Sequence, residues 1–208
     1  MTDNLLEEEA RTILLGDSEA AINATRRALD NGLNIEDIIL RGVLKAWMDY
    51  SEWYHRDPDG ALSRWSECYI ATHKVLRLLE ARISPTPNPL FTVLVITVKG
   101  EGHIVVKDLL TVLLKAKGLK VYEMRKGVVI EEILEHLSDP SLKFVIISCT
   151  QEETRESIID LIERIREIRS DLKIVTGGPI AEGLGADIVI SDPSKLFDTL
   201  IDDTKSNC

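Results

Sequence analysis

The sequence predicts an N-terminal four-helix bundle joined to a C-terminal α/β domain with a doubly wound parallel sheet. Three observations lead to this fold class. Apolar residues follow helical spacing from Asn4 to about Ile83, and a stretch with three alternating prolines, 84–89, ends that pattern. Beyond it, short apolar strands alternate with helical segments, which indicates a parallel sheet with right-handed crossovers.

Composition sets limits on the class of protein. The hydrophobic fraction of 44% and charged fraction of 29% are typical of a soluble globular chain, and 208 residues suffice for two cores. The net charge of −10 argues against a general nucleic-acid or anionic-membrane binder. Because no apolar run could span a membrane and the acidic N-terminus lacks signal regions, we expect a cytoplasmic protein. Cys68, Cys149 and Cys208 are too widely spaced to indicate a disulfide framework or a zinc site.

The N-terminal half divides into four helices at short breaks. Gly16 ends the first helix, and either Asp17 or Ser18 can cap the second. Short turns between helices favour an antiparallel bundle. The helices are expected at about Leu5 to Leu15, Ser18 to Asn31, Asn34 to His55 and Pro58 to Ala81. We assign 1–84 to this bundle, 85–90 to a proline-rich linker and 91–208 to the α/β domain.

The C-terminal half contains about five strands, which fit a Rossmann-like sheet of flavodoxin-like order 2-1-3-4-5. Loops after the first and third strands, Lys99 to His103 and Cys149 to Glu153, then flank one crevice. The strands are expected at Phe91 to Val98, Lys120 to Glu123, Phe144 to Cys149, Lys173 to Thr176 and Asp187 to Ile190. The helices between and after them are expected at Ile104 to Lys117, about Val129 to Leu137, about Glu153 to Ser170, shortly after Pro179, and about Pro193 to Ile201.

The turn after the first strand carries the most suggestive chemistry. Glu101 stands two residues before His103, so its carboxylate can fix the imidazole tautomer and leave the other ring nitrogen free for a metal. One histidine does not make a zinc site, but it can be the single axial ligand of a metal held by a macrocycle. Gly100 and Gly102 match a dinucleotide fingerprint only partly, since the third glycine is missing. A flavin or nucleotide site is therefore disfavoured.

Residues 97–118 resemble the corrinoid-binding segment of cobalamin-dependent methyltransferase corrinoid proteins and of the cobalamin domain of methionine synthase. The family signature is D-x-H-x-x-G, then S-x-L after about forty residues, then G-G somewhat under thirty residues later. Here Glu101-x-His103-x-x-Val106 is followed by 41 residues (107–147), Ser148-x-Thr150, 26 residues (151–176) and Gly177-Gly178. The helical half also resembles the cap bundle of these proteins.

The resemblance implies cobalamin as cofactor, with His103 as the lower axial ligand of cobalt. Glu101 would hydrogen-bond this histidine, and Thr154 would continue the relay. The nucleotide tail would enter between the first and third strands, with Ser148 meeting its base and the glycine pair leaving room. The cofactor-binding residues so implied are Glu101, Gly102, His103, Val106, Ser148, Thr150, Thr154, Gly177 and Gly178; none is assigned a catalytic role.

Three of these positions depart from the signature. Glu101 replaces an aspartate and adds a methylene, Val106 replaces a glycine beside the tail, and Thr150 replaces a leucine. Aromatic residues on the third and fourth helices are explained most simply as bundle core, and alternatively as a cover for the upper face of the corrin. They are Trp47, Tyr50, Trp53, Tyr54, Trp65 and Tyr69.

The function implied by the resemblance is that of a corrinoid protein carrying a methyl group on cobalt between a donor and an acceptor. Such a carrier is a subunit of a methyltransferase system rather than a stand-alone enzyme. Its expected partners are methyltransferase subunits and a corrinoid-reactivating protein, and the proline-rich linker would let the helical cap move. The alternative is a divergent cobalamin-binding sensor or module without methyl transfer.

Overall fold

The computed structural model describes residues 2–124 and 126–206, so Cys208 lies outside the described residues. The chain divides into two compact units, Met1–Ser84 and Pro85–Cys208. The division falls within the proline-rich stretch, where three prolines prevent a helix from continuing. Among the described residues, no helix combines the length and apolar character that crossing a membrane requires.

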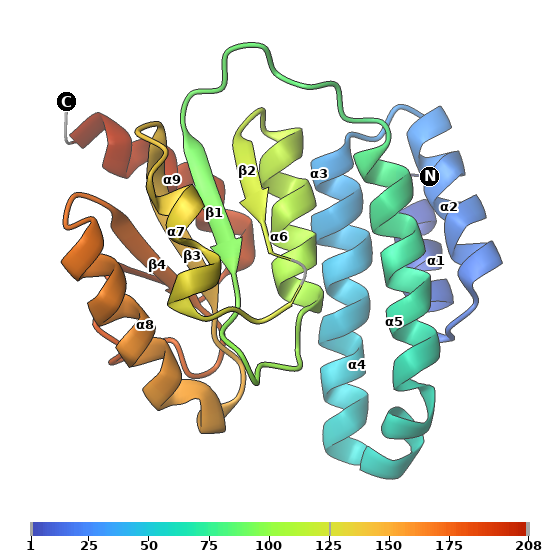
Figure 1. Ribbon diagram of the computed structural model, residues 1–208. Helices are drawn as coiled ribbons and strands as arrows, with labels where there is room; N and C mark the ends of the chain where they lie inside the picture. Colours follow the sequence, from blue (N-terminus) through green and yellow to red (C-terminus); the bar gives the residue numbers. More distant parts are fainter. Residues whose placement is uncertain (1, 125, 207–208) are drawn as a thin grey trace. The chain divides into compact units, whose positions relative to one another are not determined.

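The first unit consists of helices, blue to teal in Figure 1. The carboxylate of Asp17 accepts a hydrogen bond from the Ala20 amide, and Asp57 caps the last helix through the Gly60 amide. The predicted third helix is one continuous helical path that contains a π-helical turn. The elements are α1 (Thr2–Leu14), α2 (Ser18–Asp30), α3 (Ile35–Ile38), η1 (Ile39–Val43), α4 (Leu44–Arg56) and α5 (Pro58–Glu80). These four helical stretches confirm the predicted bundle.

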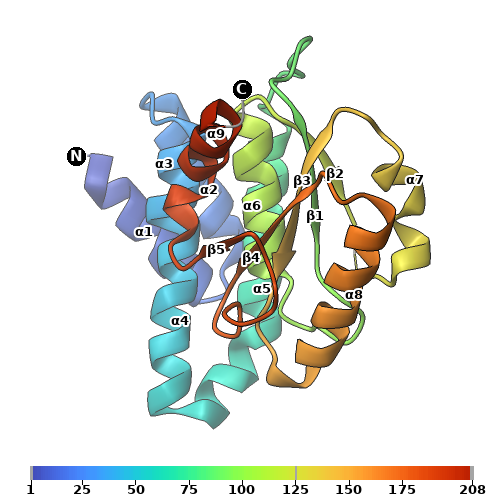
Figure 2. The same ribbon diagram turned by 90° about the vertical axis from the view of Figure 1, so that its left-hand side faces the viewer.

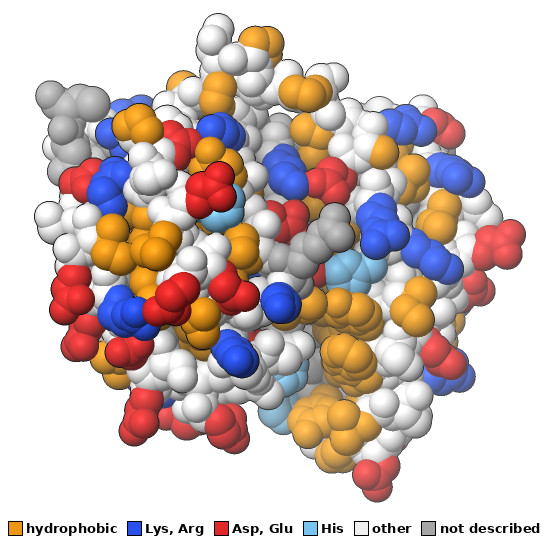
Figure 3. All heavy atoms as spheres, in the orientation of Figure 1, with side chains coloured by type: hydrophobic (Ala, Val, Ile, Leu, Met, Phe, Trp, Pro, Cys, Tyr) orange, Lys and Arg blue, Asp and Glu red, His pale blue; other side chains and the backbone are white. Residues whose placement is uncertain are grey.

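Aromatic residues form part of the packing between α4 and α5. Tyr50 is buried and donates a hydrogen bond to the carbonyl oxygen of Ala61, and the indole of Trp47 donates to Thr72. Apolar side chains also gather on the surface of these helices, as the orange patch over α4 and α5 in Figure 3 shows. Exposed apolar residues of these two helices are Met48, Tyr54, Leu62 and Ile70.

The second unit contains a five-stranded parallel sheet of order β2-β1-β3-β4-β5, which confirms the predicted flavodoxin-like order. The strands are β1 (Thr92–Ile96), β2 (Lys120–Glu123), β3 (Leu142–Ser148), β4 (Lys173–Gly177) and β5 (Ile188–Ile190). Side chains of β1 are buried on both faces, as expected for a central strand between helix layers. The strand order reverses at β1 and β3, so the loops after these strands flank the switch point.

Helices cover both faces of this sheet, as Figure 2 shows. One face carries α6 (Val105–Ala116) and α9 (Leu196–Ser206), and the other carries α7 (Leu134–Leu137) and α8 (Arg155–Ile168). Short 3₁₀ turns, η2 (Ile130–Glu132), η3 (Glu152–Thr154) and η4 (Pro193–Lys195), precede α7, α8 and α9. Leu94, Ile96 and Val98 belong to the core under α7 and α8, so residues between them face α6 and α9.

Two of the predicted helices differ in the structure. The segment 129–137 is broken into η2 and α7, because the Glu132 carboxylate bonds the Val129 amide and closes a tight turn. The helix predicted after Pro179 is absent from the described residues, where turns occupy 179–184. Gly183 and Gly185 take φ values of 73° and 84°, a left-handed conformation that interrupts a right-handed helix.

Candidate functional site

Two loops at the carboxyl edge of the sheet are clasped together by hydrogen bonds. The buried carboxylate of Glu101 accepts bonds from the backbone amides of Thr150 and Gln151, both at 3.0 Å, and of His103 at 2.8 Å. In return, the side-chain oxygen of Gln151 accepts a bond from the Gly102 amide at 2.9 Å. We call these four bonds the loop clasp. It joins the turn after β1 to the loop after β3, as the switch-point prediction requires.

His103 lies just before α6, at the edge of this clasp. Its Nδ1 is 3.4 Å from the carboxylate of Glu101, while 55% of its side chain is exposed to solvent. The structure therefore brings the predicted pair together, with the imidazole projecting outward. The glutamate has one methylene more than aspartate, and its carboxylate spans from the histidine amide to the second loop.

Thr154 bonds differently from the sequence-based expectation, and Gln151 is a site residue that carries no such expectation. The Thr154 hydroxyl donates its proton to the carbonyl oxygen of Gln151 at 2.7 Å, so the predicted relay from Thr154 to Glu101 is not formed by a donated bond. Thr154 instead supports the loop that contains Gln151. Sequence reasoning does not identify Gln151 as a site residue. Its only sequence signal is a polar side chain in a switch-point loop, which does not specify a partner 49 residues away.

A cavity of about 150 Å³ lies between α6, α9 and strands β3 to β5. Of the predicted residues, Val106, Ser148, Gly177 and Gly178 line it. The remaining lining residues, all uncharged, are Leu110, Ile146, Ile147, Val175, Thr176, Ile190, Ser191, Pro193 and Leu196. The cavity lies over β3 and β4 and has no lining residue from β1, so it is displaced from the expected entry between the first and third strands.

The glycine pair has a role in the fold itself. Gly178 takes a φ of 121°, and a Cβ atom there would lie 2.1 Å from the carbonyl oxygen of Cys149. At Gly178, the space that a side chain would fill is thus occupied by the backbone of Cys149 and not left open for a ligand. Position 178 needs to be glycine because the loops after β3 and β4 approach closely there. Gly177 has more room, since a Cβ atom there would lie 3.2 Å from the carbonyl oxygen of Ile190.

Cys149 follows β3 beside the site but is fully buried. Its thiol donates to the carbonyl oxygen of Ile147, and burial raises the pKa of this thiol to about 12. It therefore stays protonated at neutral pH and acts as a core residue.

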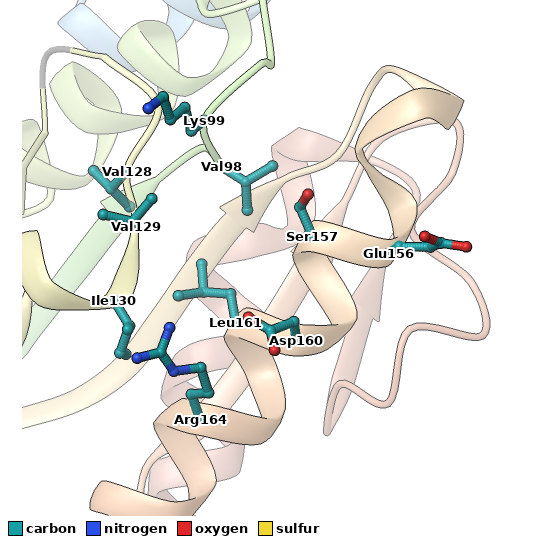
Figure 4. A pocket seen from close by; sticks show the side chains of 10 residues that line it. All are labelled: Val98, Lys99, Val128, Val129, Ile130, Glu156, Ser157, Asp160, Leu161 and Arg164. Atoms are coloured by element: carbon teal, nitrogen blue, oxygen red, sulfur yellow. The ribbon is translucent and has the colours of Figure 1, made fainter.

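A second cavity, of about 440 Å³, opens at the carboxyl end of β1 on the opposite face of the sheet. Figure 4 shows Val98 and Leu161 pointing toward the space between β1 and α8. Its rim carries charges of both signs, including Lys99, Asp160 and Arg164. Sequence reasoning does not find this cavity, because its walls come from segments far apart in the chain.

The donor set fits a metal that arrives in a macrocycle. Within 2–124 and 126–206, no three histidine, cysteine or acidic side chains gather as a metal site, so His103 can supply only a single ligand. An uncharged cavity near it suits an aromatic, uncharged group. In addition, Thr97 buries a hydroxyl that has no hydrogen-bond partner among the described residues, as expected where a ligand supplies the partner.

Comparisons with known proteins identify the family. The sequence profile of the B12 binding domain matches residues 91–200. Trimethylamine corrinoid protein from Methanosarcina barkeri is 30% identical over 182 residues, 83% of each chain. Trimethylamine corrinoid protein 2 from Methanosarcina mazei is 24% identical over 196 residues, 89% of each chain. The structure of the Methanosarcina barkeri monomethylamine corrinoid protein matches the fold with a TM-score of 0.82 at 16% identity, covering 97% of this chain and 99% of that chain.

These matches agree with the fold and with the donor set described above. The profile match spans the whole sheet and includes the loop clasp, His103 and the cavity. The predicted resemblance and the predicted cobalamin cofactor are thereby confirmed, whereas the roles of individual residues stay predictions. This chain belongs to the B12 binding domain family and is a corrinoid-binding protein.

Proposed function

We propose that this protein is a corrinoid carrier of a cobalamin-dependent methyltransferase system, and that His103 is the residue that would ligate the cobalt. The observation that carries the proposal is the exposed imidazole of His103, held on a clasped turn near an uncharged cavity. When bound, the corrinoid supplies a cobalt centre that accepts and releases a methyl group. The protein holds and orients this group, so it acts as a carrier rather than as a stand-alone enzyme.

The residues of the site divide into two groups. Glu101, Gly102, Thr150 and Thr154 hold the loops that present His103, which ligates through the ring nitrogen remote from Glu101. The cavity receives the base of the nucleotide tail. It is lined by Val106, Ser148, Gly177 and Gly178.

The names of the relatives support a class of methyl donor. Relatives of this chain are called trimethylamine or dimethylamine corrinoid proteins. We therefore propose a methylated amine as the donor, with a methyltransferase subunit that delivers the methyl group and a second that removes it. A corrinoid-reactivating protein is a further expected partner. The role of the helical unit as a movable cap on the 85–90 linker stays a prediction.

One observation favours the alternative, a cobalamin-binding module without methyl transfer. Val106 stands where the family signature has glycine, and its side chain lines the cavity. A valine there narrows the space for the nucleotide tail. Loading the protein with corrinoid, reducing the cobalt to Co(I) with a chemical reductant, and adding a methylated amine with its methyltransferase distinguishes the two functions, because only a carrier acquires the methyl group.

The ligand assignment is tested by the absorption spectrum of protein reconstituted with hydroxocobalamin and then desalted. We expect the wild-type protein to retain corrinoid in the form whose own base is replaced by a protein imidazole. His103→Ala should retain about tenfold less, or show no imidazole ligation, because the imidazole proposed as the ligand is gone.

His136→Ala serves as the matched control, since His136 lies in α7 on the opposite face of the sheet, with its ring 4.5 Å from that of Tyr122. It should behave like the wild-type protein. If His103→Ala retained corrinoid with an unchanged spectrum, His103 would not be the ligand. If the wild-type protein retained no corrinoid, the carrier function would be wrong.

A further inference from the structure

Thr97 buries a hydroxyl group without using it. Its side chain is fully buried, and Oγ1 has no hydrogen-bond partner within the described part of the chain. A buried hydroxyl without a partner costs free energy, because it has lost water and gained nothing in exchange. Thr92, at the other end of β1, shows the usual situation: it is equally buried, but its hydroxyl bonds Ser141 at 2.6 Å.

The sheet places Thr97 on the face that carries the uncharged cavity. Val95 pairs with Ile146, which lines the cavity, and Thr97 lies two residues after Val95, on the same face. The register pairs Ile96 with Ile147, so one step further sets Thr97 beside Ser148. Ser148 lines the cavity as well. Thr97 is therefore the neighbour of Ser148 across the sheet, on the face that carries the cavity.

The existing cavity is too small for a whole nucleotide. A space of about 150 Å³ holds roughly one benzene ring, and the cavity has about this volume. A nucleotide tail adds a second ring, a ribose and a phosphate. It must therefore extend along the sheet face, and the cavity's border at Ser148 adjoins Thr97.

We infer that Thr97 is a further corrinoid-binding residue, whose hydroxyl donates a hydrogen bond to an oxygen of the ribose-phosphate part of the nucleotide tail. This inference rests on the proposed corrinoid function and adds a contact immediately after β1 to those on β3 and β4. The hydrogen bond to the ligand then offsets the free-energy cost of burying the hydroxyl without a partner. The same group lowers the stability of the ligand-free protein and raises its affinity for the ligand.

Because the hydroxyl is expected to lower the stability of the ligand-free protein and to raise its affinity for cobalamin, Thr97→Val tests the inference. The substitution removes the hydroxyl and keeps the branched shape. We expect the ligand-free variant to have an equal or higher Tm than the wild-type protein. Its affinity for cobalamin, measured by absorbance titration, should fall about tenfold, the effect of one hydrogen bond. Affinity for cobinamide, which lacks the nucleotide tail, should not change. Thr97→Ser should restore most of the affinity for cobalamin.

Thr92→Val is the matched control, because it removes a buried hydroxyl of β1 that already has a partner, the hydroxyl of Ser141. It should lower the Tm and leave the affinity for cobalamin unchanged. The inference is overturned if Thr97→Val binds cobalamin as the wild-type protein does, if cobinamide affinity falls equally, or if the Tm falls as in Thr92→Val. A wild-type protein that binds neither corrinoid would overturn the proposed function itself.

Discussion

Each unit of the chain buries a glutamate, and the two carboxyl groups differ in how many hydrogen-bond donors surround them. Glu101 of the α/β unit accepts bonds from three backbone amides. Glu9 of the helical unit is fully buried, and its Oε1 lies 2.5 Å from the hydroxyl of Thr25, while Oε2 has no partner among the described residues. Burial raises the pKa of Glu9 to about 8. Two buried carboxyl groups thus have different roles: Glu101, with three amide donors, joins two loops, whereas Glu9 has one neighbouring hydroxyl and an oxygen without a partner among the described residues.

The geometry around Glu9 agrees with a protonated carboxyl group. Thr25 has a single hydroxyl proton, and its oxygen also lies 2.9 Å from the carbonyl oxygen of Ala21. When that proton goes to Ala21, the short contact with Glu9 needs a proton from the carboxyl group. Gly42, in the π-helical turn, leaves the space that Oε2 occupies, since a Cβ there would lie 1.9 Å from it.

The largest expected effect is on the pH dependence of the free energy of unfolding of the helical unit. The folded pKa of Glu9, about 8, exceeds the value of 4.5 in the unfolded chain, so the folded state holds more protons between these values. The free energy of unfolding should therefore fall by about 3 kcal/mol between pH 5 and pH 8. Glu9→Gln, which cannot ionise, should abolish most of this loss.

Urea unfolding followed by tryptophan fluorescence measures this effect, because all three tryptophans, Trp47, Trp53 and Trp65, lie in the helical unit. Glu7→Gln at the exposed surface of the same helix is the control and should keep the wild-type slope. An equal slope in Glu9→Gln and the wild-type protein would contradict a neutral Glu9.

The second largest effect is expected from Glu101→Ala, which breaks the loop clasp. It leaves three amides of two loops without their acceptor, so the free energy of unfolding of the α/β unit should fall by roughly 2 kcal/mol. Retention of corrinoid should fall as well, because the turn that presents His103 is no longer held. Urea unfolding followed by circular dichroism measures the stability.

The matched control for the clasp is Glu153→Ala, an exposed carboxyl group in the same loop. It should leave both stability and corrinoid retention unchanged. Unchanged stability in Glu101→Ala would show that water replaces the carboxylate at no cost, and that the clasp does not hold the two loops.

The smallest effect is expected from Gln151→Ala. It removes a single acceptor, the one for the Gly102 amide, and that amide is exposed enough for water to take its place. The free energy of unfolding should fall by about 0.5–1 kcal/mol. Gln151→Glu keeps an acceptor oxygen and should restore the stability. A loss as large as in Glu101→Ala would mean that the side chain of Gln151 is the main support of the turn.

Much of this site could be predicted from local sequence. A strand followed by a glycine-containing turn and a helix places Glu101 and His103 at the carboxyl edge of the sheet whatever the details of packing. Glu9 could also have been found, since it lies on the helix face of Leu6, Ala10 and Ile13, all buried. Gln151 could not, because its partner depends on how two loops meet.

The order of helices and strands, the parallel sheet and the turn that presents His103 all follow from local sequence, since the spacing of apolar residues, prolines and glycines encodes them. Four features of the site depend instead on packing. Glu101 bridges two loops, Thr154 bonds Gln151, the carbonyl oxygen of Cys149 leaves no room for a Cβ at Gly178, and Thr97 has no hydrogen-bond partner among the described residues. Each of these depends on distances between atoms that local patterns do not fix. Such distances are set by how distant segments pack together, which the local spacing of residues in the sequence does not specify.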